Sequence, residues 1–119
     1  MASNRKQIQE DTHLRILRLL NENPEISTRE IADLVGISNG GAYYCLNALI
    51  EKGLIKIGNF SSSKHKNRYA YILTPRGISE KASLTKRFLV RKRMEFEALK
   101  DEIDALETEI HVGSETGID

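Results

Sequence analysis

Four polar side chains recur within a short segment of the chain: Asn39, Tyr43, Tyr44 and Asn47. An Asn amide can form two hydrogen bonds with the edge of an adenine, and a Tyr hydroxyl can donate to a phosphate or lie near a thymine methyl group. Gly40 has no side chain, which would let a phosphate come close to the backbone at the start of a helix. These residue types and their spacing favour contact with double-stranded DNA.

Two short helices joined by a tight turn are predicted over residues 26–47, the segment that carries these side chains. Ser27 and Glu30 have the spacing of a capping box, in which the Ser hydroxyl accepts from the N–H of Glu30 and the Glu carboxylate reaches the N–H of Ser27. Gly36 ends the first helix, because Gly tolerates the left-handed conformation that a helix stop needs, and Ser38 can cap the second. This pattern is typical of a helix-turn-helix, whose second helix enters the DNA major groove.

An ordinary pair of packed helices in a small α domain is the alternative interpretation. The two caps, the Gly turn and the small alanines near the predicted crossing together favour DNA binding over it. Thr28 and Arg29 start the first helix of the pair and are expected to contact backbone phosphate, although Arg29 is equally suited to a solvated surface position. One of Tyr43 and Tyr44 is expected to pack in the core instead of facing the groove.

A first helix and a pair of strands are predicted on either side of these two helices. The first helix starts at Asp11 or Thr12, has an apolar face, and ends before Pro24. Residues 54–57 alternate apolar and polar side chains, and residues 69–73 are rich in β-branched and aromatic ones, so both are expected to be strands.

The loop between these strands, residues 61–68, is too long for a tight turn and carries three Lys or Arg residues. Such a basic tip can lie along DNA phosphates or in the adjacent minor groove, and three helices followed by a basic hairpin are typical of a winged helix. Taken alone, the loop could equally be solvated and disordered. The tip residues expected to contact DNA are Lys64, His65, Lys66 and Arg68.

A long helix with a heptad seam is predicted over residues 78–110, which contain no Pro or Gly and follow a Thr74-Pro75 start. Seam positions recur with alternating steps of four and three residues, as in a coiled coil, and only Thr85 and Lys92 interrupt the apolar pattern. Basic residues fill the first half and acidic residues the second, which favours an antiparallel pair of these helices. The residues expected to form a homodimer are Ile78, Ala82, Leu89, Phe96, Leu99, Ile103, Leu106 and Ile110.

The predicted fold is mainly α with a small β-hairpin. A winged helix-turn-helix domain over residues 11–77 is followed by a long C-terminal coiled-coil helix, residues 78–110, for dimerisation. Residues 1–10 and 111–119 are polar and are expected to be disordered tails. With 119 residues, of which 39% are hydrophobic and 29% charged, the chain suits one small core and a long solvated element.

Composition argues against several classes of function. No apolar stretch is long enough to span a bilayer, the N-terminus has no signal-peptide core, and a single Cys excludes an internal disulfide, which together suit the cytoplasm. The three His residues and Cys45 share no metal-ligand spacing, and no catalytic motif is present, so no metal, no cofactor and no enzyme activity are expected. Cys45 is interpreted as a small core residue in preference to a redox sensor. In residues 1–77, 11 Lys or Arg against 7 Asp or Glu are compatible with a nucleic-acid partner.

Four phrases of the sequence carry a family resemblance: residues 23–27, 44–54, 71–78 and 84–89. Over roughly residues 11–110 the chain resembles the MarR-type winged-helix transcriptional regulators, and more narrowly their short exopolysaccharide (EPS)-associated branch. The resemblance implies a cytoplasmic bacterial dimer that binds operator DNA, and the branch implies control of exopolysaccharide genes. Many larger MarR-type proteins hold a small ligand between their dimerisation and DNA domains, but no residue here identifies an effector.

The expected function is that of a bacterial DNA-binding transcriptional regulator. It would bind an inverted-repeat operator as a homodimer, through a recognition helix at about residues 38–52 and the basic wing at residues 61–68. The alternative is a winged-helix protein-interaction adaptor without sequence-specific DNA binding, because the predicted recognition helix is rich in Tyr and poor in Lys and Arg.

Overall fold

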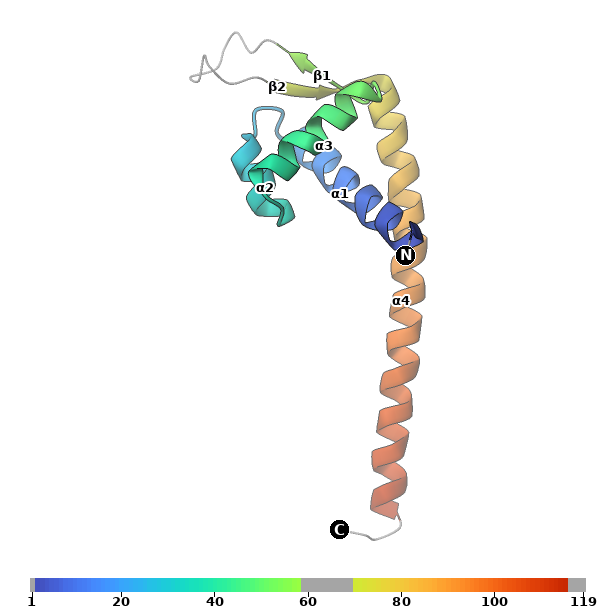
Figure 1. Cartoon of the computed structure of the whole chain (residues 1–119). Helices are drawn as coiled ribbons and strands as arrows, with labels where there is room; N and C mark the ends of the chain where they lie inside the picture. The colour runs from blue at the N-terminus through green and yellow to red at the C-terminus, as the bar shows by residue number, and fades with distance from the viewer. Residues whose placement is uncertain (1, 59–69, 116–119) are drawn as a thin grey trace. The chain divides into compact units, whose positions relative to one another are not determined.

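A computed structural model describes residues 2–58 and 70–115, with side chains at residues 4–58 and 70–113 (Figure 1). The chain divides into two compact units, residues 1–85 and residues 86–119. The mainly helical fold with its two-stranded hairpin confirms the predicted winged helix-turn-helix with a long last helix. The elements follow in the order α1 (Ala2–Glu22), α2 (Thr28–Val35), α3 (Asn39–Glu51), β1 (Ile55–Gly58), β2 (Ala70–Leu73) and α4 (Pro75–Glu115).

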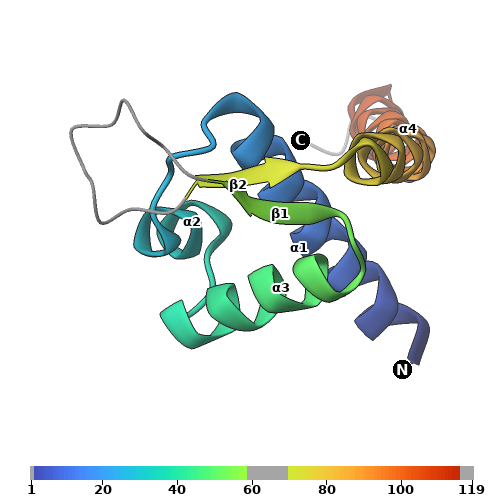
Figure 2. The ribbon, with the colours of Figure 1, turned by 90° about the horizontal axis from the view of Figure 1, so that it is seen from above.

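The core of the first unit lies between α1, α2, α3 and the hairpin. α1 contacts α2 and β2, while α3 contacts α2 and β1 (Figure 2). Each buried Leu or Ile side chain contributes about 1.5–3 kcal/mol to folding, so this cluster fixes which face of α3 points inward. The largest fully buried side chains are Ile16, Leu17, Leu20, Ile31, Leu46, Leu49 and Ile55.

α1 begins at Ala2, so the predicted start at Asp11 or Thr12 was wrong, and residues 2–10 belong to a helix and not to a disordered tail. No Gly or Pro interrupts these residues. Thr12 is not an N-cap, because its hydroxyl donates to the carbonyl of Ile8 at 2.9 Å, as a Thr inside a helix does.

The hairpin pairs β1 and β2 antiparallel, with Ile55 opposite Leu73 and Gly58 opposite Ala70. Both strands match the predicted positions to within one residue at each end. Ile55 and Leu73 lie opposite each other on one face of the hairpin and are both buried, so this pair closes the core. Ala70, on the other face, is buried as well. The residues that join the two strands lie outside the described part of the chain.

Thr74 connects the hairpin to α4. Its hydroxyl accepts from the N–H of Gly77 at 3.0 Å and donates to the carbonyl of Gly53 at 2.6 Å, while its own N–H donates to the carbonyl of Leu54 at 3.0 Å. These bonds confirm the predicted Thr cap ahead of Pro75. Gly77 is required here for its small size, because a Cβ atom would overlap the carbonyl oxygen of Leu54.

α4 is longer than predicted, since it runs from Pro75 to Glu115 and not only over residues 78–110. Residues 111–115 were assigned to a disordered tail and instead continue the helix. Gly113 lies inside this helix, where a single Gly costs only about 1 kcal/mol, which a helix of 41 residues tolerates.

Candidate nucleic-acid interface

The caps of α2 and α3 place the two helices as the sequence predicted. The Ser27 hydroxyl accepts from the N–H of Glu30 at 3.1 Å and donates to its carboxylate at 3.0 Å, and the Ser38 hydroxyl accepts from the N–H of Gly41 at 2.9 Å. Gly36 ends α2 with a φ of 81°, the left-handed conformation that Gly adopts without strain. The helix-turn-helix geometry is therefore built from local hydrogen bonds.

One face of α3 is buried and its opposite face is exposed. Ala42, Leu46 and Leu49 pack in the core. Successive residues of a helix are about 100° apart, so residues 40, 44 and 47 lie near the far side and residue 43 lies on the flank. The residues predicted for the groove-facing surface are all exposed: Asn39, Gly40, Tyr43, Tyr44 and Asn47.

The expectation that one Tyr packs in the core was wrong. Tyr43 is 57% exposed and Tyr44 is 70% exposed. Both residues directly follow the fully buried Ala42, and one or two helical steps of about 100° carry them away from the core. Two large aromatic side chains therefore stand next to Asn47 on the open face of α3 without a packing role.

The two glycines at the start of α3 differ in their surroundings. A Cβ atom at Gly41 would lie 3.2 Å from the Ser38 hydroxyl, so this position is kept small by the cap itself. A Cβ atom at Gly40 would meet nothing within 4 Å, so nothing in the described part of the chain requires Gly there. Gly40 is consistent with close approach of a partner to the helix start.

Thr28 and Arg29 occupy the first turn of α2, with Thr28 half-buried and Arg29 exposed. A helix N-terminus presents free N–H groups and the positive end of the helix dipole, both of which attract phosphate. The position of these residues is compatible with the predicted phosphate contacts.

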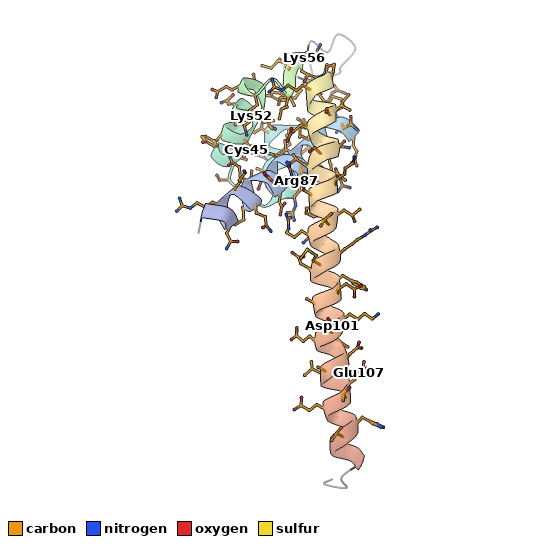
Figure 3. All side chains as sticks on the ribbon, turned by 90° about the vertical axis from the view of Figure 1, so that its right-hand side faces the viewer. Cys45, Lys52, Lys56, Arg87, Asp101 and Glu107 are labelled. Atoms are coloured by element: carbon orange, nitrogen blue, oxygen red, sulfur yellow. The ribbon has the colours of Figure 1, made fainter. Side chains whose placement is uncertain are left out.

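The predicted wing contacts Lys64, His65, Lys66 and Arg68 lie outside the described residues. The described part of the hairpin carries an exposed lysine, Lys56 on β1 (Figure 3), which sequence reasoning did not select. Its polar position in the alternating strand pattern was the signal available for it.

Cys45 is half-buried on α3, and burial raises the pKa of its thiol. A raised pKa keeps the sulfur protonated, whereas a redox sensor needs a thiolate. This environment favours the interpretation of Cys45 as a packing residue.

His13 on α1 is a buried polar residue that sequence reasoning missed. It is 5% exposed, and its Nε2 atom has no hydrogen-bond partner among the residues that the structure describes. Burial lowers the pKa of His13, the nearby charge of Lys52 lowers it further, and Glu10 opposes both effects. It sits on the apolar face of α1 next to Leu14, so its helical position could have signalled burial.

The seam of α4 forms a second exposed surface. Among its predicted dimer residues, Ala82 is exposed, and the seven large apolar side chains are each between 45% and 72% exposed. Large exposed apolar patches often belong to interaction sites, so the seam is a candidate interaction surface. The large seam residues are Ile78, Leu89, Phe96, Leu99, Ile103, Leu106 and Ile110.

Residues 9–56 match the protein family described as winged helix-turn-helix DNA-binding. The chain therefore contains a winged helix-turn-helix DNA-binding domain, in agreement with its capped helix pair and hairpin. No curated protein matches the chain significantly.

The solved structures that resemble the chain include MarR-family transcription regulators. A MarR/EmrR family regulator from Acinetobacter sp. ADP1 is 23% identical, with a TM-score of 0.62 over 88% of this chain and 75% of that one. The transcriptional repressor CouR, solved with a 23-mer DNA duplex, is 27% identical, with a TM-score of 0.59 over 83% and 70%. A MarR regulator from Methanosarcina mazei Go1 is 16% identical, with a TM-score of 0.59 over 86% and 76%.

These similarities support a transcription regulator. No helix in the described part of the chain is long and apolar enough to cross a membrane.

Proposed function

We propose that this protein is a MarR-family transcription regulator that reads double-stranded DNA with the exposed face of α3. The observation that carries the proposal is that Tyr43, Tyr44 and Asn47 are exposed on the side of α3 away from the core, in a domain of a DNA-binding family. A helix-turn-helix uses this face of its second helix in the major groove.

Each part of the surface has a distinct role in this proposal. Asn47 provides a base contact through its amide, and the two tyrosines contact phosphate or thymine methyl groups. Gly40 allows close approach of a phosphate, and the first turn of α2 binds phosphate through Thr28 and Arg29. Outside the described residues, the wing adds three cations along the backbone, Lys64, Lys66 and Arg68, and the polar ring of His65.

The protein acts as a homodimer on an inverted repeat, with the α4 seam as its dimer surface. A dimer with two-fold symmetry matches two half-sites of opposite orientation. Replacing Leu99 on the seam by Glu should give monomers in sedimentation. Val90→Glu is the matched control, because Val90 is also exposed, at 60% against 54% for Leu99, but lies off the seam; an equal loss of dimer in both variants would contradict this surface.

We further assign the protein to the EPS-associated branch of the MarR family. In this proposal it acts in the cytoplasm, and its targets are exopolysaccharide genes. Its support is the resemblance of residues 44–54, the recognition-helix phrase, to that branch. Binding to DNA alone, without a catalytic step, accounts for the function.

The test is a comparison of two amide truncations in a DNA-binding assay on the DNA upstream of this gene. Asn47→Ala should weaken binding by about 1–3 kcal/mol and relax the preference at one base pair. Gln9→Ala is the control, because Gln9 is an exposed amide on α1 and not on α3, and should leave affinity unchanged. Equal affinities for wild type and Asn47→Ala would contradict the base contact.

A protein-interaction adaptor is the second candidate, since α3 exposes Tyr residues and its open face holds no Lys or Arg. It predicts that the same Tyr residues are needed for binding a protein and that no DNA fragment is bound in a sequence-dependent way.

A further inference from the structure

The outer part of α4 has segregated charges. Residues 86–93 hold five Lys or Arg and no Asp or Glu, whereas residues 94–110 hold seven Asp or Glu and one Lys. Figure 3 shows Arg87 in the first stretch and Asp101 and Glu107 in the second. α4 therefore carries a basic segment followed by an acidic segment, in addition to its apolar seam.

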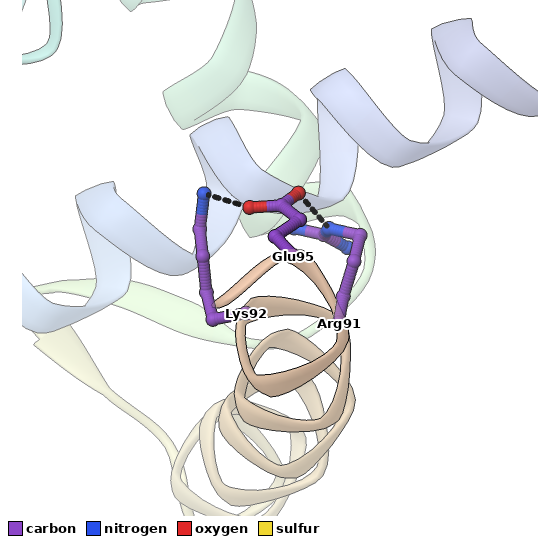
Figure 4. Close-up of polar contacts among 3 residues, drawn as sticks. All are labelled: Arg91, Lys92 and Glu95. Atoms are coloured by element: carbon purple, nitrogen blue, oxygen red, sulfur yellow. Dashed lines mark hydrogen bonds and ion pairs between the residues drawn. The ribbon is translucent and has the colours of Figure 1, made fainter. Parts of the chain in front are cut away.

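Lys92 stands in the seam, but its ammonium group turns out of it. Its Nζ lies 3.1 Å from the Glu95 carboxylate and 5.1 Å from the centre of the Phe88 ring, and Arg91 contributes a second cation to Glu95 (Figure 4). Phe88 and Glu95 flank the seam on one side. The aliphatic stem of Lys92 is thereby left on the seam, where it can cover an apolar neighbour.

We propose that two copies of this chain pair through α4 in antiparallel orientation, crossing at the level of Met94. The inference rests on the proposed homodimer and names the orientation and register of its partner. In this register Ile78 of one copy lies at the level of Ile110 of the other, and Lys92 lies at the level of Phe96.

Side-chain volumes along the seam favour this arrangement. The antiparallel register sets Ala82 against Leu106 and Thr85 against Ile103, so that a small side chain meets a large one. A parallel pair in register would set Ala82 against Ala82 and Phe96 against Phe96, which leaves one layer underfilled and crowds another. Complementary volumes fill the interface evenly, as close packing requires.

Charge complementarity favours the same orientation. Antiparallel helices bring the basic segment 86–93 of each copy alongside the acidic segment of the other. Parallel helices would place basic beside basic and acidic beside acidic, and would set Lys92 against its own copy in the seam. Arg93 and Glu95 do face their own copies near the antiparallel crossing, but single exposed charge pairs contribute little.

Cysteine cross-linking distinguishes the orientations, because the two seam ends are far apart. Ile78 and Ile110 are separated by about 48 Å along α4 at 1.5 Å per residue, whereas a disulfide needs Cα atoms within about 7 Å. Both residues are exposed and lie at the ends of the overlap, so cysteines there leave the central layers intact. The full chain is used with Cys45→Ala, and one variant of each mixture carries a size tag.

Antiparallel pairing predicts rapid disulfide formation in an equal mixture of Ile78→Cys and Ile110→Cys chains and none in either variant alone. A mixture of Ile78→Cys and Ile103→Cys, about 10 Å out of register, is the matched control and should cross-link far more slowly. Rapid cross-linking of each single variant with itself would show parallel helices and overturn the inference while leaving the proposed dimer intact.

Sedimentation of the Cys45→Ala chain before oxidation separates the remaining outcomes. A dimer that cross-links in none of the mixtures would overturn the pairing through α4. A monomer under all concentrations would contradict the proposed homodimer itself, and with it this orientation.

Discussion

At the scale of single residues, the surface of α3 combines polar and aromatic side chains that have no role in folding. Tyr43 and Tyr44 point away from the core, and Asn47 lies between them in angle around the helix axis. Tyr and Gly both have a lower helix propensity than Ala, so helix stability alone does not favour these residues. Contact of this face with DNA, as proposed above, would account for their presence.

Gly40→Ala should change the stability of the protein and its affinity for DNA in opposite directions. The added Cβ meets nothing within 4 Å, so the variant should be more stable by up to about 1 kcal/mol in chemical denaturation. Its affinity for DNA should fall, because the methyl group would occupy the space of an approaching phosphate. Gly41→Ala is the comparison, since its Cβ lies 3.2 Å from the Ser38 hydroxyl and should disturb the cap instead. A Gly40→Ala protein that binds DNA as tightly as wild type would contradict the close approach.

His13 makes stability depend on pH. Its pKa in the folded protein is lowered below the ordinary 6.5, chiefly by burial, so the unfolded chain binds the proton more readily. Stability should therefore be full above about pH 6.5 and decrease as the pH falls through the lowered pKa of the folded state. Denaturation of His13→Leu between pH 7.5 and 5.5 should show a weaker decrease than wild type, because the titrating group is gone. Identical curves for the two proteins would show that His13 is not the group responsible.

At the scale of elements, local caps position α3 and a close backbone contact positions the start of α4. Three helices are preceded by a residue whose hydroxyl accepts a hydrogen bond from an N–H of the first turn: Ser27, Ser38 and Thr74. Thr74 also bonds to Gly53, which ties the hairpin end to the turn after α3. Short-range hydrogen bonds thus position the start of α3 and the start of α4.

Two glycines of the same helix, Gly77 and Gly113, should respond to Ala in opposite directions. Gly77→Ala should destabilise the protein by about 1–3 kcal/mol, as overpacking does, because its Cβ would overlap the Leu54 carbonyl. Gly113→Ala should stabilise α4 by up to about 1 kcal/mol, since its Cβ meets nothing within 4 Å. Thermal unfolding of both variants checks this pair, and a neutral Gly77→Ala would show that the contact relaxes without cost.

At the scale of the whole molecule, sequence patterns predicted what local chemistry determines. Capping spacing located α2 and α3, strand alternation located the hairpin, and the heptad pattern located most of α4. The predictions that failed concern features of the fold that no local sequence pattern determines. The start of α1 was missed because polar residues 2–10 can form a helix or a tail, and the Tyr43 orientation depends on which face of α3 meets the core.

If this protein binds DNA through charged and polar contacts, its affinity must depend on the salt concentration. Affinity of the full chain for the DNA upstream of its gene should fall linearly on a log–log scale, with a slope near −0.9 for each phosphate contacted. Changing Lys64, Lys66 and Arg68 together to Ala should weaken binding to all DNA sequences alike and make the slope shallower by about 2 to 3. Absence of any salt-sensitive binding to that DNA would contradict a DNA-binding regulator and leave the protein-interaction adaptor in its place.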